Sequence, residues 1–534
     1  MKKYLLFTIL LIGAGLCIKA QPANINLSGT AAFEGEPYLA VNPTNPQNIV
    51  VAWMADDLAT GLRMSIRSKV SFDGGTTWGN QYIQPHFGAT WYSADVSIQF
   101  RNNGTLYLSY IDYHQAPDSG GVYITHSVDG GISWSAPTQV WNGITEDPTK
   151  RPLDRPWLVA DNSGTPTDGM LYITTKPAPW ITPPNRPYLK TSADSGQTWS
   201  AYRYIDTLNY LVGNLIAAPM AAPAVTADGA LCLAYPSYLP SQSIYPKVLL
   251  AKSYSRGATF SYCDLLVNAV GLSTADSSYK AGYPLAANPV NANQLAFAYL
   301  DNRNGDPDVY ITTTNDGGIT WGTTVRVNDD AIGNGVGQDM CWLSYNTSGN
   351  LVAVWRDRRN GSGTGFAQST DTYCAVSTDN GLTFHANVRM SNLSAPYNTV
   401  LLQSGNDFMS CKLINDTVNV AWGDMRSAHM NIYFAKTSAL TGSGSGISIV
   451  NNEDEMFTVY PNPAKDKITI IANIDNNKEN IIFNIADAQG KIVYQSEIKN
   501  KQTIINVSNL SEAEYFCNMI ANDKKYVQKL LITK

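Results

Sequence analysis

The chain carries little charge: only 15% of its 534 residues are Asp, Glu, Lys or Arg, and its formal net charge is -6. Lysine and arginine form no dense block. Nucleic acids and anionic membrane surfaces attract proteins through concentrated positive charge, so neither is an expected partner. Long apolar runs are also scarce, because none beyond the N-terminus approaches the roughly 18 to 20 residues of a membrane span. We therefore expect no membrane span.

Motifs of several enzyme classes are missing as well. The five histidines never show H-E-x-x-H spacing, and neither a G-x-S-x-G elbow nor a phosphate-binding P-loop occurs. Apart from Cys17, the six cysteines form no C-x-x-C pair, which argues against a metal site built on them. Cys232 could pair with Cys263, or Cys341 with Cys374, while buried thiols are the open alternative.

The first 20 residues have the features of an export signal. Two lysines are followed by an apolar run from Tyr4 to about Ile18, and the small residue Ala20 precedes Gln21. This pattern predicts a signal peptide that is cleaved after Ala20 and does not belong to the fold. The mature protein is therefore expected to pass through the periplasm and to be secreted or held at the cell surface.

A short sequence box recurs along most of the remaining chain. It reads SFDGGTTW at Ser71, SVDGGISW at Ser127, SADSGQTW at Ser192, TNDGGITW at Thr314 and STDNGLTF at Ser377, with a degenerate copy, SYSRGATF, at Ser253. Successive copies begin 56 to 65 residues apart. A regular period of this length indicates a solenoid, a propeller or a similar array.

Each period contains four strand patterns and no convincing helix. EPYLAVNP, NLVAVW, VYITTT and TTVRVNDD illustrate the first to fourth strands. Four strands per repeat are typical of a β-propeller blade. Residues 406–436 supply only three strands of a last blade, and Asn24 to Thr30 can complete it, which would cover an open edge. The sequence thus predicts an all-β, seven-bladed β-propeller; six blades with irregular final strands are the alternative.

The side chains of the box suit a tight turn. Its Asp can accept N–H bonds from its own hairpin, its glycines can take positive φ, and its Trp or Phe can pack between sheets. We therefore interpret the box as structural. With its consensus SxDxGxTW on a four-stranded period, residues 24 to about 438 resemble the Asp-box, or bacterial neuraminidase repeat, proteins. That resemblance implies a propeller of the kind found in sialidases and many other secreted proteins.

The composition changes after TGSGSG, since residues 453–534 contain neither Trp nor Arg and alternate like strands. Tyr460 to Pro463, Asp487 to Lys491 and Lys529 to Lys534 are similar to motifs of the C-terminal sorting domain of type IX secretion cargo. The resemblance implies an immunoglobulin-like β-sandwich that acts as an address for that machinery; a sugar-binding or spacer module is the alternative. We divide the chain into a signal peptide (1–20), propeller (21–440), Gly/Ser linker (441–452) and sorting domain (453–534).

Ligands of a propeller are expected at the end opposite the boxes, where first strands begin and second strands join third strands. Charged residues gather at these positions, and Asp-x-Arg recurs in the joining loops. The candidate catalytic residues are Glu36, Asp95 and Tyr283, and the candidate substrate-binding residues are Asp154, Arg155, Arg303, Arg358 and Arg426. Arginine can hold a substrate carboxylate bidentately, and a carboxyl group with a carboxylate or tyrosine can hydrolyse a glycoside.

Three functions follow as hypotheses. The first is a secreted, sialidase-like glycoside hydrolase of an acidic or complex glycan; the sialidase resemblance implies an arginine triad from the four arginines, Tyr283 as nucleophile and Asp95 as acid. The second is a non-catalytic propeller that binds glycan or protein at the cell surface, with each Asp-x-Arg paired internally. The third is a polysaccharide lyase using His114 and Tyr113. No cofactor is expected, although the carboxylates from Asp301 to Asp308 could hold calcium.

Overall fold

The computed structural model describes residues 22–30, 33–57, 62–88, 90–114, 119–213, 221–267, 280, 282, 284–362, 365–397, 406–438, 457–472, 481–487, 491–498, 500–521 and 524–534. Residues 20–443 form one compact unit, and residues 444–534 belong to a second. Within the described ranges the regular structure is strand, apart from one short 3₁₀ helix, η1 (Pro148–Lys150). The predicted all-β fold class is confirmed. The predicted signal peptide and linker lie outside these ranges.

The described part of the first unit contains seven four-stranded antiparallel sheets. The first sheet comprises β2 (Phe33–Asn42), β3 (Asn45–Asp57), β4 (Leu62–Ser71) and β5 (Tyr82–Ile83). The second comprises β6 (Trp91–Phe100), β7 (Leu106–His114), β8 (Gly120–Ser127) and β9 (Thr138–Asn142). The third comprises β10 (Leu153–Ala160), β11 (Leu171–Pro177), β12 (Tyr188–Ser192) and β13 (Arg203–Tyr204).

The remaining sheets repeat this order. The fourth comprises β14 (Ala222–Val225), β15 (Leu231–Ser237), β16 (Lys247–Ser253) and β17 (Ser261–Val267). The fifth comprises β18 (Leu285–Ala287), β19 (Leu295–Asp301), β20 (Asp308–Thr314) and β21 (Val325–Arg326). The sixth comprises β22 (Gln338–Tyr345), β23 (Leu351–Asp357), β24 (Asp371–Ser377) and β25 (Val388–Arg389). The seventh comprises β26 (Ser410–Ile414), β27 (Thr417–Asp424), β28 (Asn431–Ser438) and β1 (Ile25–Asn26).

The N-terminal strand completes the seventh sheet. β1 pairs with β28 so that Ile25 lies opposite Phe434, and Leu27 donates its N–H to the carbonyl of Ile432 at 2.8 Å. Leu27 is buried beside Ile432 and Phe434. The strand predicted within Asn24 to Thr30 therefore covers the edge that β28 would otherwise expose. The last three strands form a regular sheet, not the irregular packing that the six-blade alternative required.

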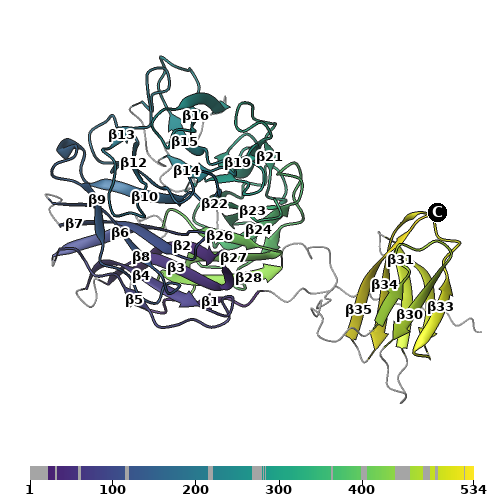
Figure 1. The fold of residues 1–534 in the computed structure, drawn as a ribbon. Coiled ribbons are helices and arrows are strands. Elements are labelled where there is room, and N and C mark those ends of the chain that lie inside the picture. Colours follow the sequence, from purple (N-terminus) through teal and green to yellow (C-terminus); the bar gives the residue numbers. More distant parts are fainter. Residues whose placement is uncertain are drawn as a thin grey trace, which may run out of the picture. The chain divides into compact units, whose positions relative to one another are not determined.

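The first strands of the sheets contact one another in a closed cycle, in the order β2, β6, β10, β14, β18, β22, β26 and back to β2. In Figure 1 β2, β10, β14, β22 and β26 lie toward the middle of the unit, and β5, β9, β13 and β21 lie toward its periphery. β23 and β24 are buried at every residue. A strand covered on both faces reads as a continuous apolar run, which is the pattern seen in NLVAVW.

Four aromatic side chains pack together where the first strands meet. Tyr38, Trp157, Trp342 and Phe408 have ring centroids 5.5 to 6.3 Å apart, mostly edge to face. Tyr38, Trp157 and Trp342 also line a cavity of about 350 Å³ near the C-terminal ends of the first strands.

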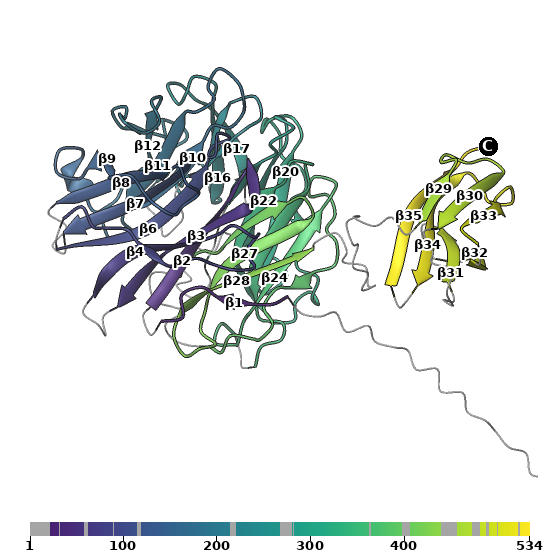
Figure 2. The same ribbon diagram turned by 60° about the horizontal axis from the view of Figure 1, so that its bottom comes forward.

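The described part of the second unit forms two antiparallel sheets (Figure 2). One contains β29 (Phe457–Tyr460), β30 (Lys467–Ala472) and β33 (Gln502–Asn506). The other contains β32 (Ile492–Ile498), β31 (Ile481–Asp487), β34 (Ala513–Ala521) and β35 (Lys524–Ile532). Phe457 and Ile470 from one sheet share a single buried core with Phe483 and Leu530 from the other.

Disulfide bonds do not contribute to the described part of the fold. All six cysteines after Cys17 are thiols, so the pairings considered for Cys232 with Cys263 and for Cys341 with Cys374 are not present. Their burial matches the alternative reading of small core residues, with only Cys263 half-buried. No helix among the described residues has the length and apolarity to cross a bilayer.

Candidate functional site

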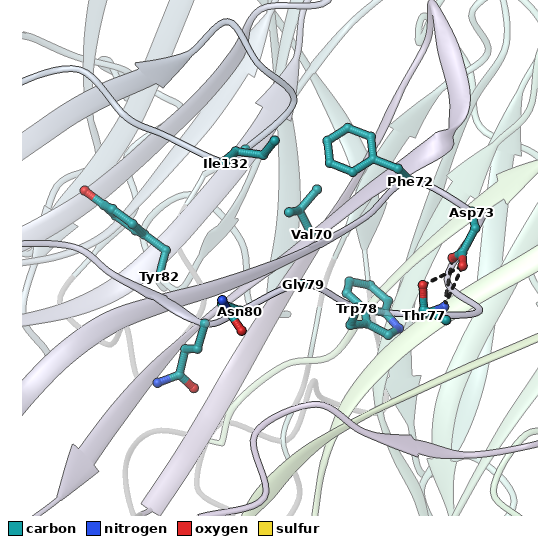
Figure 3. A pocket seen from close by; sticks show the side chains of 11 residues that line it. Val70, Phe72, Asp73, Thr77, Trp78, Gly79, Asn80, Tyr82 and Ile132 are labelled. Atoms are coloured by element: carbon teal, nitrogen blue, oxygen red, sulfur yellow. Dashed lines mark hydrogen bonds between the residues drawn. The ribbon is translucent and has the colours of Figure 1, made fainter.

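The box side chains are bonded within their own hairpins. The Asp73 carboxylate accepts the N–H of Thr77 at 2.8 Å and its hydroxyl at 2.6 Å (Figure 3). Ser71 Oγ donates to Asp73 at 2.8 Å. The Thr77 bonds, with that of Ser71, hold the pKa of Asp73 well below its usual value. In the other boxes the Ser or Thr hydroxyl four positions on likewise donates to the carboxylate of Asp129, Asp194, Asp316 or Asp379.

The degenerate box keeps the turn without its aspartate. Ser255 Oγ accepts the N–H of Thr259 at 2.8 Å, so a hydroxyl serves the backbone donor that a carboxylate serves elsewhere. A hollow of about 610 Å³ beside the first box is lined largely by ring and apolar side chains, among them Phe72, Trp78 and Ile132 (Figure 3). These contacts support the structural interpretation of the box.

The boxes and the predicted site residues lie at opposite ends of the sheets. Each box follows a third strand, which runs in the same direction as the first strand, so the boxes lie where first strands end. Gly74 of the first box accordingly donates its N–H to the carbonyl of Gln47, near the start of β3, at 2.9 Å. Glu36, Asp95 and Arg155 instead lie in the N-terminal halves of β2, β6 and β10.

A pocket of about 530 Å³ lies at this second end, where Glu36, Asp95, Asp154 and Arg155 come together. The full lining comprises Glu36, Met54, Met64, Tyr92, Ala94, Asp95, Ile111, Tyr113, His114, Pro152, Leu153, Asp154, Arg155, Ala178, Pro179, Trp180 and Asp407. We call it the acidic pocket. It combines a few convergent polar groups with apolar and aromatic walls, which is the usual composition of a ligand site.

β-Bulges set the backbone of three charged residues in the acidic pocket. The pairing register of β2, β6 and β10 shifts at a bulge in each strand. There, Glu36, Asp95 and Arg155 adopt φ values of 53°, 55° and 50°. Such values are uncommon outside glycine and cost free energy, and strained residues cluster at functional sites. Met340 in β22 has φ 55°, so the bulge belongs to the architecture and the charges distinguish these three copies.

Ion pairs hold the base of the acidic pocket. The Arg155 guanidinium pairs with Asp407, and Lys280 Nζ lies 2.7 Å from the other oxygen of that carboxylate. Lys176 Nζ lies 2.6 Å from Asp154 Oδ2. Although burial opposes ionisation, Lys176 and then Arg155 hold the pKa of Asp154 at about 2. Arg155 and Lys280 likewise lower the pKa of Asp407.

Glu36 and Asp95 have the opposite acidity. Burial, reinforced by the charge of Asp154, raises the pKa of Asp95 to about 7. Burial also raises the pKa of Glu36 well above its usual value, and the charges of Asp95 and Asp407 add to that rise. These two carboxyl groups repel each other when both are ionised. Near neutral pH the pair therefore favours holding a proton, which supplies an acid and a base together.

One oxygen of Glu36 is placed for a ligand. The residue is only 2% exposed, and its Oε2 atom is buried without a hydrogen-bond partner among the described residues. Buried polar atoms in native proteins are nearly always satisfied, so an exception that lines a pocket indicates a bond that a bound molecule would complete.

Three predicted substrate-binding arginines do not line the acidic pocket. Arg303 bonds to Asp301 at 2.7 Å and stacks 4.3 Å from the ring centroid of Tyr310. Arg426 bonds to Asp424 at 2.6 Å and lies over Tyr433. With Arg359, which pairs with Asp357 over Tyr373, these are the Asp-x-Arg clamps. Each clamp ties the hairpin loop to the third strand, as the scaffold interpretation of the recurring motif expected.

Arg358 is excluded by burial. Its side chain is fully buried and lies 3.2 Å from Asp339, which Arg356 also pairs with. An arginine in that position has no surface on which to meet a substrate. Of the four predicted substrate-binding arginines, only Arg155 lines the acidic pocket. The predicted nucleophile Tyr283 lies outside the described residues.

Tyr113 and His114, which the lyase hypothesis named, both line the acidic pocket, and Tyr113 and two of the carboxylates proposed for calcium have partners within the protein. Tyr113 accepts the N–H of Leu153 at 3.0 Å, and burial raises its pKa, so the phenol stays protonated near neutral pH and no phenolate is available as a base. Asp301 is paired with Arg303, and Asp308 accepts the Asn328 amide at 2.7 Å. Within the described ranges, no three His, Cys, Asp or Glu side chains are grouped so as to hold a metal ion.

Sequence reasoning missed Lys176, Lys280 and Trp180. Lys176 is 1% exposed near the end of β11, after the buried run YITT. A lysine that continues an apolar strand needs a buried anion, and that requirement is the sequence feature that would have marked it. Trp180 follows the segment Pro177-Ala178-Pro179 and carries no comparable pattern.

Comparison with known proteins identifies the tail. Residues 458–533 match the family model of the secretion system C-terminal sorting domain. The protein is therefore secreted or attached to the cell surface, which confirms the predicted localisation. A search of curated proteins found no match to the chain.

Several solved structures resemble the chain weakly. The Hadza microbial sialidase Hz136 is 15% identical, with 76% of this chain and 66% of that one covered and a TM-score of 0.40. The phage phi92 endosialidase is 10% identical, with 96% and 87% covered and a TM-score of 0.43. The α-L-arabinofuranosidase Arb93A from Fusarium graminearum is 13% identical, with 65% and 94% covered and a TM-score of 0.40. Similarity at this level decides neither fold nor activity, so both rest on strand pairing and pocket geometry.

Proposed function

We propose that the protein is a secreted glycoside hydrolase whose reaction takes place in the acidic pocket. Its scaffold is a seven-bladed β-propeller in which the seven sheets are the blades; the closed cycle of first strands and the pairing of β1 with β28 support this. The tail is an immunoglobulin-like sorting domain recognised by the type IX secretion machinery, in line with its matched family and its two-sheet core.

Glu36 and Asp95 carry the functional proposal. Glycoside hydrolysis requires a carboxylic acid to protonate the leaving oxygen and a carboxylate to activate water or attack the anomeric carbon. Both residues face one pocket, both have raised pKa values, and Glu36 Oε2 has an open bonding position. One of them gives its proton to the glycosidic oxygen as the C–O bond breaks, and the other serves as the base or nucleophile.

Asp154 and Asp407 act on Glu36 and Asp95 through their charge and are not themselves the proposed acid or base. Each is ionised and held by cations, Asp154 by Lys176 and Asp407 by Arg155 and Lys280. Their negative charge favours the protonated form of the neighbouring acid and stabilises the positive charge that develops on the sugar ring in the transition state. Removing Lys176 would raise the pKa of Asp154, and removing Lys280 would raise the pKa of Asp407. Either change would reduce the difference in acidity between these carboxylates and the proposed acid. Lys176 and Lys280 are therefore positioning residues.

The test measures hydrolysis with single carboxamide variants. Glu36→Gln and Asp95→Asn keep the shape of each side chain and remove its titration, so each should lower kcat by a factor of about 100 to 10,000, with KM little changed. The matched control is Asp264→Asn, because Asp264 also pairs with a lysine, at 2.7 Å, but lies outside the acidic pocket. Substrates are a panel of chromogenic glycosides and natural oligosaccharides.

Two results would contradict the hydrolase proposal. Turnover that survives in both variants would place the chemistry elsewhere. Saturable glycan binding at the acidic pocket without any turnover would favour the non-catalytic propeller, the second hypothesis drawn from the sequence.

A further inference from the structure

A second cavity lies at the box end of the sheets. It is the cavity of about 350 Å³ that Tyr38, Trp157 and Trp342 line near the C-terminal ends of the first strands, and we call it the central cavity. Among the described residues, it shares no lining side chain with the acidic pocket. Largely apolar walls with a few polar groups, at this volume, are typical of a site for a small molecule.

Small side chains on two first strands widen the central cavity. The closed cycle of first strands surrounds a space, and β14 and β18 border that space with the alanines Ala222, Ala224, Ala286 and Ala287. Alanine reaches less far from its strand than the tryptophans of β10 and β22 do. The protein's own side chains therefore leave room for a bound molecule beside these alanines.

Lys412 is the charged residue of the central cavity. It lies in β26 between Cys411 and Leu413, which are buried, and the alternation of the strand directs Lys412 to the other face. Among the described residues, the lining holds no Asp, Glu or Arg beside it, and Lys412 Nζ makes no hydrogen bond or ion pair. Lys176 and Lys190, by contrast, each pair with a carboxylate at 2.6 Å.

An ammonium group without a counter-ion is unfavourable in this setting. Burial lowers the pKa of Lys412, because the charged form loses water, and the neighbouring Cys411 thiol opposes this only in part. Lysines are seldom buried unless an anion accompanies them. A bound anion would supply the missing negative charge and would stabilise the protonated lysine.

The wall of the central cavity contains a second unused donor. Trp157 is 4% exposed, and its Nε1 atom is buried without a hydrogen-bond partner in the described part of the chain. Buried polar atoms are nearly always bonded in native proteins. Because Trp157 belongs to the cavity wall, an acceptor atom on a bound molecule can provide that bond.

We propose that the central cavity binds a small organic anion, a carboxylate with an apolar body, whose carboxylate pairs with Lys412 while its body lies against the alanine and tryptophan walls. The lysine selects for negative charge, and the apolar walls favour a body that gives up no hydrogen bonds to water on entry. The inference does not depend on the proposed hydrolase, because it concerns a different cavity and is measured by binding alone.

The test measures the binding of simple carboxylates to the full chain. The probes are phenylacetate, cyclohexanecarboxylate and hexanoate, with the primary amide of each as its neutral counterpart, and inorganic phosphate as an anion without an apolar body. Isothermal titration calorimetry gives the affinity, and tryptophan fluorescence reports the change beside Trp157 and Trp342. At least one carboxylate should bind at a single site, about tenfold or more tightly than its own amide.

Two variants at one position assign the site. Lys412→Met keeps the length of the side chain and removes its charge, so the affinity for the carboxylate should fall about tenfold or more. Lys412→Gln repeats the test with a polar side chain, should the methionine variant fail to fold. The matched control is Lys436→Met, because Lys436 is an exposed lysine of the same sheet that does not line the cavity. Its affinity should equal that of the wild type.

Three results would overturn the inference. The first is that none of the three carboxylates binds. The second is binding that a folded Lys412 variant retains at wild-type strength, which would place the anion elsewhere. The third is tighter binding of phosphate than of any carboxylate, which would show that the apolar walls make no contribution to the choice of ligand.

Discussion

At the scale of single residues, the acidic pocket combines strained backbone with unfavourable ionisation. Asp95 has a φ of 55° and a pKa raised to about 7, mainly by burial. Both features lower stability, and proteins tolerate such features where function requires them. An acid that keeps its proton near neutral pH is what general acid catalysis needs.

The raised pKa of Asp95 predicts a stability gain on substitution. Between the unfolded pKa, near 4, and the folded value of about 7, the folded protein holds a proton that the unfolded chain has lost, so this group makes stability fall as the pH rises through that window. Asp95→Asn removes the loss and should raise the free energy of unfolding by about 1 to 3 kcal/mol at pH 8, with a smaller effect at pH 4. Urea unfolding at both pH values measures it. A variant that is less stable than the wild type at pH 8 would refute the assignment.

The residue scale also shows where sequence reasoning stops. Glu36, Asp95, Asp154 and Arg155 were recognised because they stand at the entries of first strands. The orientation of the predicted triad arginines could not be predicted, because a recurring Asp-x-Arg looks the same in sequence whether its arginine folds back on its own aspartate, as Arg303 does, or projects into a pocket. Only side-chain geometry separates the two cases.

At the scale of elements, the Asp-x-Arg clamp and the box are repeated sets of contacts that hold the loops at the ends of the strands. In the seventh sheet, Arg426 bonds to Asp424, and Trp422 Nε1 donates to the same carboxylate at 2.9 Å. Because Asp424 is buried, its charge depends on these partners. The clamp thus fixes the loop between β27 and β28 without contributing to the acidic pocket.

The clamp predicts separable effects on stability and activity. Arg426→Ala leaves the buried Asp424 carboxylate with fewer partners and should lower the free energy of unfolding by about 2 to 4 kcal/mol. In the folded fraction, kcat/KM should stay within about twofold of the wild type. Denaturant unfolding and steady-state kinetics give the two numbers. A loss of kcat/KM at unchanged stability would instead restore Arg426 as a substrate ligand.

At the scale of the whole molecule, the repeats specified most of the architecture. The four-strand period, the boxes and the strand around Ile25 were readable because each sheet repeats the same turn chemistry and apolar runs. The sequence predicted at which end of the sheets a ligand would bind, but it did not predict the detailed geometry of that site. The positive φ at Glu36 and Arg155 and the ion pairs of Lys176 and Lys280 join residues distant in sequence, and no local pattern encodes them.

The most direct test of the central claim is the pH dependence of kcat/KM for the best glycoside of the panel. If Glu36 and Asp95 share the catalytic proton, the wild-type profile should be bell-shaped, with one limb near pH 7, the value to which burial raises the pKa of Asp95. In Asp95→Asn that limb should move or vanish, because its titrating group is gone. A wild-type profile that is flat between pH 5 and 9, or an Asp95→Asn profile that superimposes on it, would contradict catalysis by this pair.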